Sequence, residues 1–427
     1  MSVRMARGKP HRVFVVSDPT PVTPLAVPAA GTWLLDRPLA ARSRLAFEEA
    51  GLEVEPVGSF EEAATRAADG GGVVTYDSVY ASPRVVRGLL ERFASGDEPA
   101  IQAALPDAQA TRRLAHIDGL EAVTVDGKPA FTAPLIAVAP GGDARSATPA
   151  LLPYQERKLS FSIPVGMFGE GDASFAATDG VLVRVGHWAH VLRLNLSAFL
   201  AGWIDRWHRP SGRLWYLWRA LLGFPWRRGR LGEAIRRVHP KAKVHHRAVV
   251  ELSVIQEGAY VGANAVIKSS WIGKGARIDD GAMVSASVVG AGAFVASGSG
   301  IFNCVLCPGA FAAQHKMQFS VLGENSVAFT GSYFYDLNFE RNVRVPFRGK
   351  LADAGERFLS VCLGPWARVA GGVWIASGRE VPAGALVVQP PDRVLSKIDE
   401  GLAGERRVTV DGGRSVDAGE LPRIRPS

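Results

Sequence analysis

Aliphatic residues recur every 17 residues between Arg237 and about Ser320, in five consecutive units with one slip. Within each unit, three apolar positions lie six, six and five residues apart. The first is Val238, Ile255, Ile272, Val289 and Leu306, and the last is Val250, Ile267, Val284 and Ile301 before the pattern fails at Gln318. This spacing matches neither one face of an α-helix nor an alternating β-strand.

The repeat predicts a triangular coil in which each side is a short strand that directs one branched side chain inward. Gly-Ala pairs stand near the expected corners, at 258–259, 275–276, 292–293 and 309–310. A corner needs positive φ or little bulk, and glycine supplies both. Because one coil cannot bury its own interior, stability comes from stacked coils. We therefore predict a parallel β-helix over residues 237–395, with an excursion at 331–357.

Residues 1–145 alternate short apolar runs with helical patterns, which predicts a Rossmann-like α/β domain with a parallel sheet. The apolar run Arg12–Val16 ends at Ser17-Asp18, and a second run ends at Asp77. Ligands of parallel sheets bind beyond the carboxyl ends of the strands, where both aspartates are expected. Residues 146–236 follow as an irregular segment and a helical linker, and residues 396–427 form a polar tail.

Composition narrows these expectations. With 47% apolar residues the chain is globular, and its three cysteines favour a reducing compartment and packing roles over a metal site. The start lacks the apolar run of a signal peptide, and no stretch of about 18 apolar residues could span a bilayer. We therefore expect a cytoplasmic protein.

Basic residues are concentrated in the linker. Nine arginines stand against Asp205 and Glu233 between Ala201 and Arg237, a local net charge of +7 in a chain of +8. Six of the ten tryptophans lie between Trp188 and Trp226. Such helices either lie on anionic membranes or pack beneath the β-helix with tryptophan buried. Nucleic-acid binding would fit the charge, but no motif supports it.

The order of the parts resembles the bifunctional sugar-1-phosphate nucleotidylyltransferase/acetyltransferases, of which N-acetylglucosamine-1-phosphate uridylyltransferase is representative. The segment from Trp188 to Asn195 resembles the linker of that family, and Gly323-Glu-Asn325 resembles the segment that precedes its closing coils. The resemblance implies a left-handed hexapeptide-repeat β-helix and a homotrimer with sites between neighbouring prisms. It also favours a packed linker, because the family has helices at this place.

The α/β domain is similar to a nucleotidyltransferase domain in outline, but it departs from the family at the nucleotide site. Family members hold phosphates with the backbone N–H groups of a glycine-rich loop. Here the loop is Ser17–Pro24, which has three prolines, no glycine and no basic residue, and proline donates no N–H. We interpret the domain as degenerate. Asp77 resembles the family's metal-binding aspartate and would bind Mg²⁺ only if the domain is active; otherwise it is a strand-end residue.

The resemblance also implies candidate residues for acyl transfer. His315 corresponds to the family's general base, although it lies two residues late in an ungapped register and could be an ordinary surface histidine. The family's acyl-contacting asparagine maps near Asp336, which has no N–H to donate, so Asn338 close by is the candidate acyl contact. Residues expected to contact a substrate phosphate or coenzyme A are Lys316, Tyr333, Tyr335, Arg341 and Arg344.

These observations predict a transferase of the nucleotidyltransferase/hexapeptide acyltransferase type. Acyl transfer from acetyl-CoA to an amino sugar or sugar phosphate is the expected reaction, with His315 as base. Two alternatives stay open. The chain could be a catalytically inactive trimeric scaffold or regulator, or a membrane-surface assembly factor that uses the arginine- and tryptophan-rich segment.

Overall fold

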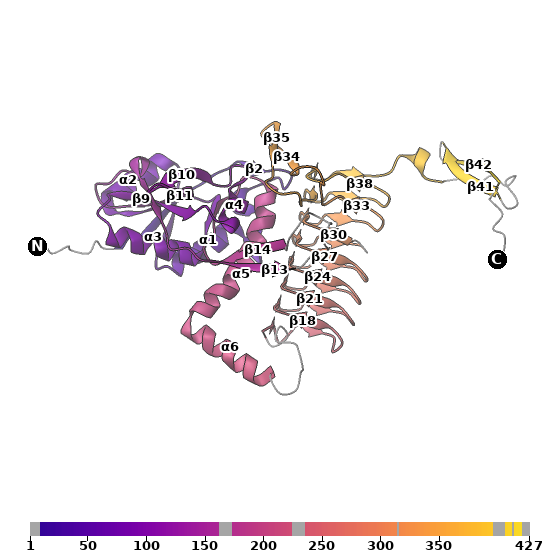
Figure 1. Cartoon of the computed structure of the whole chain (residues 1–427), viewed down its shortest axis with the longest axis horizontal. Coiled ribbons are helices and arrows are strands. Elements are labelled where there is room, and N and C mark those ends of the chain that lie inside the picture. Colours follow the sequence, from indigo (N-terminus) through magenta and orange to yellow (C-terminus); the bar gives the residue numbers. More distant parts are fainter. Residues whose placement is uncertain are drawn as a thin grey trace, which may run out of the picture.

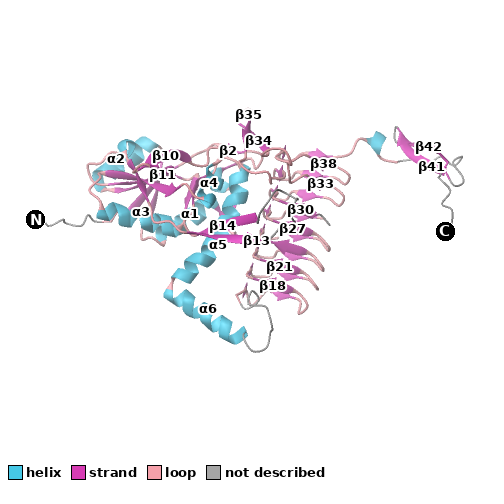
Figure 2. Ribbon diagram, in the orientation of Figure 1, coloured by secondary structure: helices cyan, strands magenta, loops and turns pink. Residues whose placement is uncertain are grey.

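The computed structural model describes residues 9–161, 173–223, 235–313, 316–395, 406–411 and 414–420. Figure 1 shows an α/β domain beside a column of stacked coils, with the long helix α5 between them and α6 pointing away. Figure 2 shows mixed helices and strands in the α/β domain and only short strands within the column of coils. No described helix is long and apolar enough to cross a membrane.

The α/β domain is built on a sheet with strand order β12-β9-β11-β7-β1-β6, and β10 pairs with β11. The strands are β1 (Arg12–Val16), β6 (Glu53–Val57), β7 (Gly72–Tyr76), β9 (Ala100–Pro106), β10 (Glu121–Val125), β11 (Lys128–Val138) and β12 (Thr148–Leu151). The sheet is mixed, so the prediction of a parallel sheet was wrong: β11 runs antiparallel to β7 and β9. A tight hairpin at Asp126-Gly127, both with positive φ, leads from β10 into β11.

Helices cover both faces of this sheet. They are α1 (Leu39–Glu48), α2 (Phe60–Gly70), α3 (Pro83–Ser95) and α4 (Gln109–Ala115). Alternate residues of β1 point to opposite sides, so Phe14 packs with α2 whereas Val13 belongs to the core that α1 and α3 cover. Ser59 begins α2, because its hydroxyl accepts a hydrogen bond from the backbone N–H of Glu62 at 3.2 Å.

The stacked coils form three parallel sheets, which confirms the β-helix and is consistent with the left-handed type. The first sheet contains β16 (Arg237–Val238), β19 (Val254–Ile255), β22 (Trp271–Ile272), β25 (Val288–Val289), β28 (Val305–Leu306), β31 (Val321–Leu322), β36 (Cys362–Leu363) and β39 (Glu380–Val381). The second contains β17 (Lys243–Val244), β20 (Tyr260–Val261), β23 (Arg277–Ile278), β26 (Phe294–Val295), β29 (Phe311–Ala312), β32 (Val327–Ala328), β37 (Arg368–Val369) and β40 (Leu386–Val387). The third contains β18 (Val249–Glu251), β21 (Val266–Lys268), β24 (Met283–Ser285), β27 (Gly300–Phe302) and β30 (Lys316–Gln318), and the pair β33 (Tyr333–Phe334) and β38 (Trp374–Ile375) continues it.

The slip in the repeat is a one-residue deletion, and the coil keeps its packing there. Ile301 of β27 pairs with Met317 of β30, which is buried, whereas Gln318 points outward. The predicted alignment of Gln318 with the aliphatic positions was therefore wrong by one residue. Val295 pairs with Ala312, 17 residues later, whereas Gly300 pairs with Lys316, 16 residues later, so the inward position passes to the residue before Gln318.

The excursion leaves the column and packs against the α/β domain. It forms the hairpin of β34 (Arg344–Phe347) and β35 (Lys350–Asp353), whose flanking residues Val343 and Ala354 are buried in the same core as the α/β domain. The column continues without a gap, because β31 of the coil before the excursion pairs directly with β36 of the coil after it.

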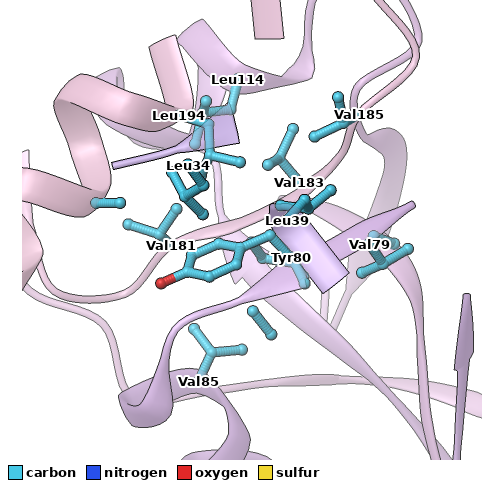
Figure 3. Close-up of a cluster of buried hydrophobic side chains, with 14 of the residues drawn as sticks. Leu34, Leu39, Val79, Tyr80, Val85, Leu114, Val181, Val183, Val185 and Leu194 are labelled. Atoms are coloured by element: carbon cyan, nitrogen blue, oxygen red, sulfur yellow. The ribbon is translucent and has the colours of Figure 1, made fainter. Parts of the chain in front are cut away.

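Helix α5 (Trp188–His208) joins the two parts, and α6 (Pro210–Gly223) follows it. Figure 3 shows Leu194 of α5 among side chains of the α/β domain, including Leu34 and Tyr80. The side-chain amide of Asn195 accepts a hydrogen bond from Leu35 N and donates to Trp33 O, each at 2.8 Å. The first half of α5 therefore packs against the α/β domain, whereas Trp207 near its end and Trp218 of α6 are exposed.

A buried ion pair connects α5, the α/β domain and the excursion. The guanidinium of Arg193 lies 2.7 Å from the carboxylate of Glu356 and donates to the carbonyl groups of Arg113 and Ala354. Arg113 lies 3.2 Å from the same carboxylate. Burial alone would raise the pKa of Glu356, but the two arginines outweigh it and lower that pKa.

His190 is buried in a neutral form at the same junction. Its Nδ1 accepts from Gly186 N at 3.1 Å and its Nε2 lies 2.8 Å from the carbonyl oxygen of His116, so the proton sits on Nε2. Burial lowers the pKa of His190 to about 3. A second proton would stand on Nδ1, facing the N–H of Gly186.

We expect the free energy of unfolding to fall as the pH drops from 6.5 toward 3. The unfolded chain protonates His190 near its ordinary pKa of 6.5, whereas the folded chain does so only near 3, so the unfolded state binds more protons within that window. The expected slope is about 1.4 kcal/mol per pH unit. Urea unfolding at pH 7, 6 and 5 measures it; His190→Gln should flatten the slope, and His11→Gln, an exposed control, should not. A wild-type slope unaffected by His190→Gln would contradict this account.

The variant Glu356→Gln should lower the free energy of unfolding by about 3 kcal/mol, because it leaves Arg193 buried without its counter-charge. Asp118→Asn removes the same charge from an exposed pair with Arg348 and should cost less than about 1 kcal/mol. Denaturant titration at pH 7 compares them. Equal losses would show that the buried pair does not hold the parts together.

Candidate functional site

Two strand ends of the α/β domain meet as the sequence predicts. The carboxylate of Asp77, after β7, accepts a hydrogen bond from the backbone N–H of Asp18, after β1, at 2.8 Å. Ser78 donates to the Asp18 carboxylate at 3.1 Å. Burial raises the pKa of Asp77, and the neighbouring charge of Asp18 adds to that effect.

Arg184, which sequence reasoning missed, closes this cluster. It lies at the end of β15 (Leu182–Arg184), which pairs with β8 (Val79–Ala81), and its guanidinium is 2.9 Å from the Asp18 carboxylate. Burial would raise the pKa of Asp18, but hydrogen bonds from Arg184, Thr20 and Ser78 outweigh it and lower that pKa to about 2. The same guanidinium lies 5.5 Å from the centre of the Tyr76 ring. No feature near Asp18 in the sequence pointed to a partner 166 residues away.

The cluster does not fit a magnesium-bound nucleotide. Arg184 already neutralises Asp18, and the described residues bring no three candidate ligands together. In the loop after β1, the backbone N–H of Thr20 is directed to Asp18 itself at 3.2 Å, and the prolines have none to offer. Asp77 therefore acts here as a strand-end acceptor, and a metal-binding role for it stays a prediction without support.

The predicted acyl-transfer residues lie in two places. His315 falls outside the described residues. Lys316 begins β30 on the third face of the column, and Tyr333 follows it one coil later on the same face. On the preceding coil, Gly300 pairs with Lys316. A side chain at position 300 would contact the aliphatic part of the lysine side chain.

Three aromatic rings gather on this third face. Tyr333 and Trp374 are 61% and 66% exposed, and their ring centres are 5.9 Å apart in an edge-to-face arrangement. Tyr335 lies 6.3 Å from Trp374 in the same way. Trp374 was not among the predicted site residues. The repeat resumes after the excursion, and Trp374 occupies an outward position of that repeat, on β38. We call Lys316, Tyr333, Tyr335 and Trp374 the third-face platform.

The remaining candidates belong to the start of the excursion. The side-chain oxygen of Asn338 accepts from the backbone N–H groups of Glu340 and Arg341 at 3.1 and 3.3 Å, which makes it a turn residue. Asp336 is partly buried, and burial raises its pKa. Arg341 and Arg344 are exposed, Arg344 at the start of the hairpin.

The Gly323-Glu-Asn325 segment lies at a corner that faces the α/β domain. Glu324 accepts a hydrogen bond from the indole N–H of Trp33, so this segment is part of the contact between the domains. The cysteines serve packing, as the sequence predicts. All three are free and buried, and burial raises the pKa of Cys304 and Cys307 to about 12. Cys304 occupies a place in a ladder of stacked serines, where it accepts from Ser320 N and Ser287 accepts from Cys304 N.

Comparisons with known proteins add little to this geometry. No family model and no curated protein sequence matches the chain. Among solved structures, a Bacillus cereus chain described as a "putative acetyltransferase" matches with 13% sequence identity, covering 44% of this chain and 78% of its own length. The TM-score of that match is 0.17, which is too low to carry an argument about fold or function.

Proposed function

We propose that the chain is a hexapeptide-type acyltransferase whose reaction takes place at the third face of the β-helix. The observation that carries this proposal is the third-face platform. Exposed aromatic rings, with a lysine on the preceding coil of the same face, suit a ligand that combines a stacking base with phosphates, as coenzyme A does. Aromatic rings of this size seldom stand in an exposed group without a partner.

We take the general base of the proposed reaction, His315, from the resemblance to the acetyltransferase family. An amine of an amino sugar or amino sugar phosphate attacks the carbonyl carbon of the thioester, and His315 takes the proton from the attacking nitrogen. The carbon–sulfur bond then breaks, and the thiolate leaves and is protonated as coenzyme A. Lys316, next to His315, holds a phosphate of the donor. Asn338 is not assigned a contact with the acyl group, because its oxygen is engaged in its own turn.

A catalytically inactive scaffold or regulator is the second candidate. The closed Asp18–Arg184 cluster supports it, because an active nucleotide site would need those groups available. In either case the expected homotrimer would cover exposed apolar residues of the column, such as Met283 and Phe302.

Acetyl-CoA and an amino sugar phosphate should give thiol release in the presence of the wild-type protein, and His315→Ala should abolish it. Release is followed with a thiol-reactive dye, which the buried cysteines of the protein do not consume. No release with a panel of amino sugars and their phosphates, together with no heat on titration of acetyl-CoA, would favour the scaffold.

Trp374→Ala should weaken acetyl-CoA binding about tenfold, because one stacking contact contributes about 1–3 kcal/mol. Trp366→Ala is the matched control, since Trp366 is an exposed tryptophan at a corner of the same column. Isothermal titration measures both. If the two variants bind alike, the platform is not the donor site.

Titration of UTP with Mg²⁺ should give no heat at millimolar concentrations, because the loop after β1 offers no phosphate cradle and Arg184 occupies the strand-end carboxylate. Tight binding of UTP would show that the α/β domain still takes nucleotides and would reverse our interpretation of it.

A further inference from the structure

A cleft of about 540 Å³ opens where the α/β domain, the α5–α6 elbow and the first coils of the β-helix meet. Its wall includes Arg42 of α1, Trp203 and Arg206 of α5, Trp215 of α6, and Arg237 and Trp271 of the first coils. None of these residues belongs to the third-face platform. The cleft is therefore a separate place where a ligand could bind.

Two arginines of this cleft have no carboxylate partner among the described residues. Arg209 of the same cleft pairs with two carboxylates that also line it, those of Asp205 and Glu49, at 2.6 and 2.9 Å. In contrast, Arg206 forms no ion pair there and lies 5.2 Å from the centre of the Trp215 ring. Arg237 likewise has none; partial burial lowers its pKa, and the charge of Arg206 lowers it further. Two guanidinium groups that line one cleft, without a carboxylate partner of their own among the described residues, favour an anion beside them.

The same cleft contains buried donors without acceptors. The Nε of Arg42 and the indole Nε1 of Trp271 are both buried and form no hydrogen bond in the described part of the chain. Leaving a buried donor unpaired costs about 1–3 kcal/mol. Both side chains line the cleft, so a bound group with several acceptor oxygens would lie near donors that lack acceptors.

The surroundings of the cleft are apolar as well as basic. Phe199, Trp203 and Trp215 form a run of ring contacts along its wall, each with centres 6.3 Å apart. Next to it, α6 exposes Leu214, Leu217 and Trp218 at 70%, 59% and 61%. Their spacing of three and four residues places them on one side of the helix. An inorganic anion would leave all of this surface in water.

We propose that the cleft binds a phosphoryl group carried on an apolar body, such as an alkyl phosphate or the headgroup of an anionic phospholipid. Arg206 and Arg237 bind the phosphoryl oxygens. The rings of Trp203 and Trp215 contact the first carbons of the apolar part, and the exposed side of α6 continues the path for a longer chain. This site does not depend on acyl transfer.

Isothermal titration with hexyl phosphate tests the site in the full chain. The double variant Arg206→Gln/Arg237→Gln should bind at least tenfold more weakly than wild type, with an unchanged melting temperature as evidence of folding. Arg213→Gln is the matched control, because Arg213 lies in the same segment outside the cleft and donates to Trp207 O; it should bind within twofold of wild type. Equal weakening in both, or inorganic phosphate binding as tightly as hexyl phosphate, would overturn the proposal.

Sedimentation with vesicles distinguishes the two sources of the phosphoryl group. If the ligand is a phospholipid, phosphatidylglycerol vesicles should sediment the protein and phosphatidylcholine vesicles should not, and Leu217→Asp should abolish sedimentation. If the ligand is a free phosphate ester, hexyl phosphate binds and neither vesicle sediments the protein. Failure of hexyl phosphate and of both vesicles to bind would refute the site.

Discussion

The buried pair between Arg193 and Glu356 is the constraint on which the arrangement of this molecule depends. The arginine comes from α5, the carboxylate from the end of the excursion, and a second arginine from α4 of the α/β domain. A charge buried alone at this place would be strongly unfavourable, so the three segments stabilise one another only when all are in position. The excursion is needed to bring Glu356 to these two arginines. Through this contact it connects the column of coils to the α/β domain.

This tie determines which surfaces remain for chemistry. The first face of the column lies against the α/β domain and α5, and its outward residues Val288, Val305 and Val321 are buried in the same core. Outward residues in the same relation on the third face, Met283 and Tyr333, are exposed. The repeat alone predicts the same pattern of inward and outward residues on all three faces. Docking of the α/β domain makes them different, and it leaves the aromatic rings of the third face available.

The sequence predicted the register of the coils residue by residue, because aliphatic residues at a fixed period must all point into the column. The prediction failed where the period changes and where no repeat exists. A one-residue deletion moved the inward position to Met317, and a period alone cannot tell which residue absorbs it. Apolar runs also carry no strand direction, so the antiparallel β11 was missed although Asp126-Gly127 signals a hairpin. Arg184 could not be found at all, since its role arises from a contact between distant segments.

The α/β domain has a structural role although its loop after β1 offers no phosphate cradle. At its strand ends, a cation from within the chain now lies beside Asp18, so the carboxylate stays charged without any external ion. A domain stabilised in this way can serve as a rigid wall. It supplies α1 to one side of the arginine-lined cleft, while α5, held by the buried pair, supplies another. The cleft therefore depends on the docking of the α/β domain, which gives this domain a structural role whether or not it binds a nucleotide.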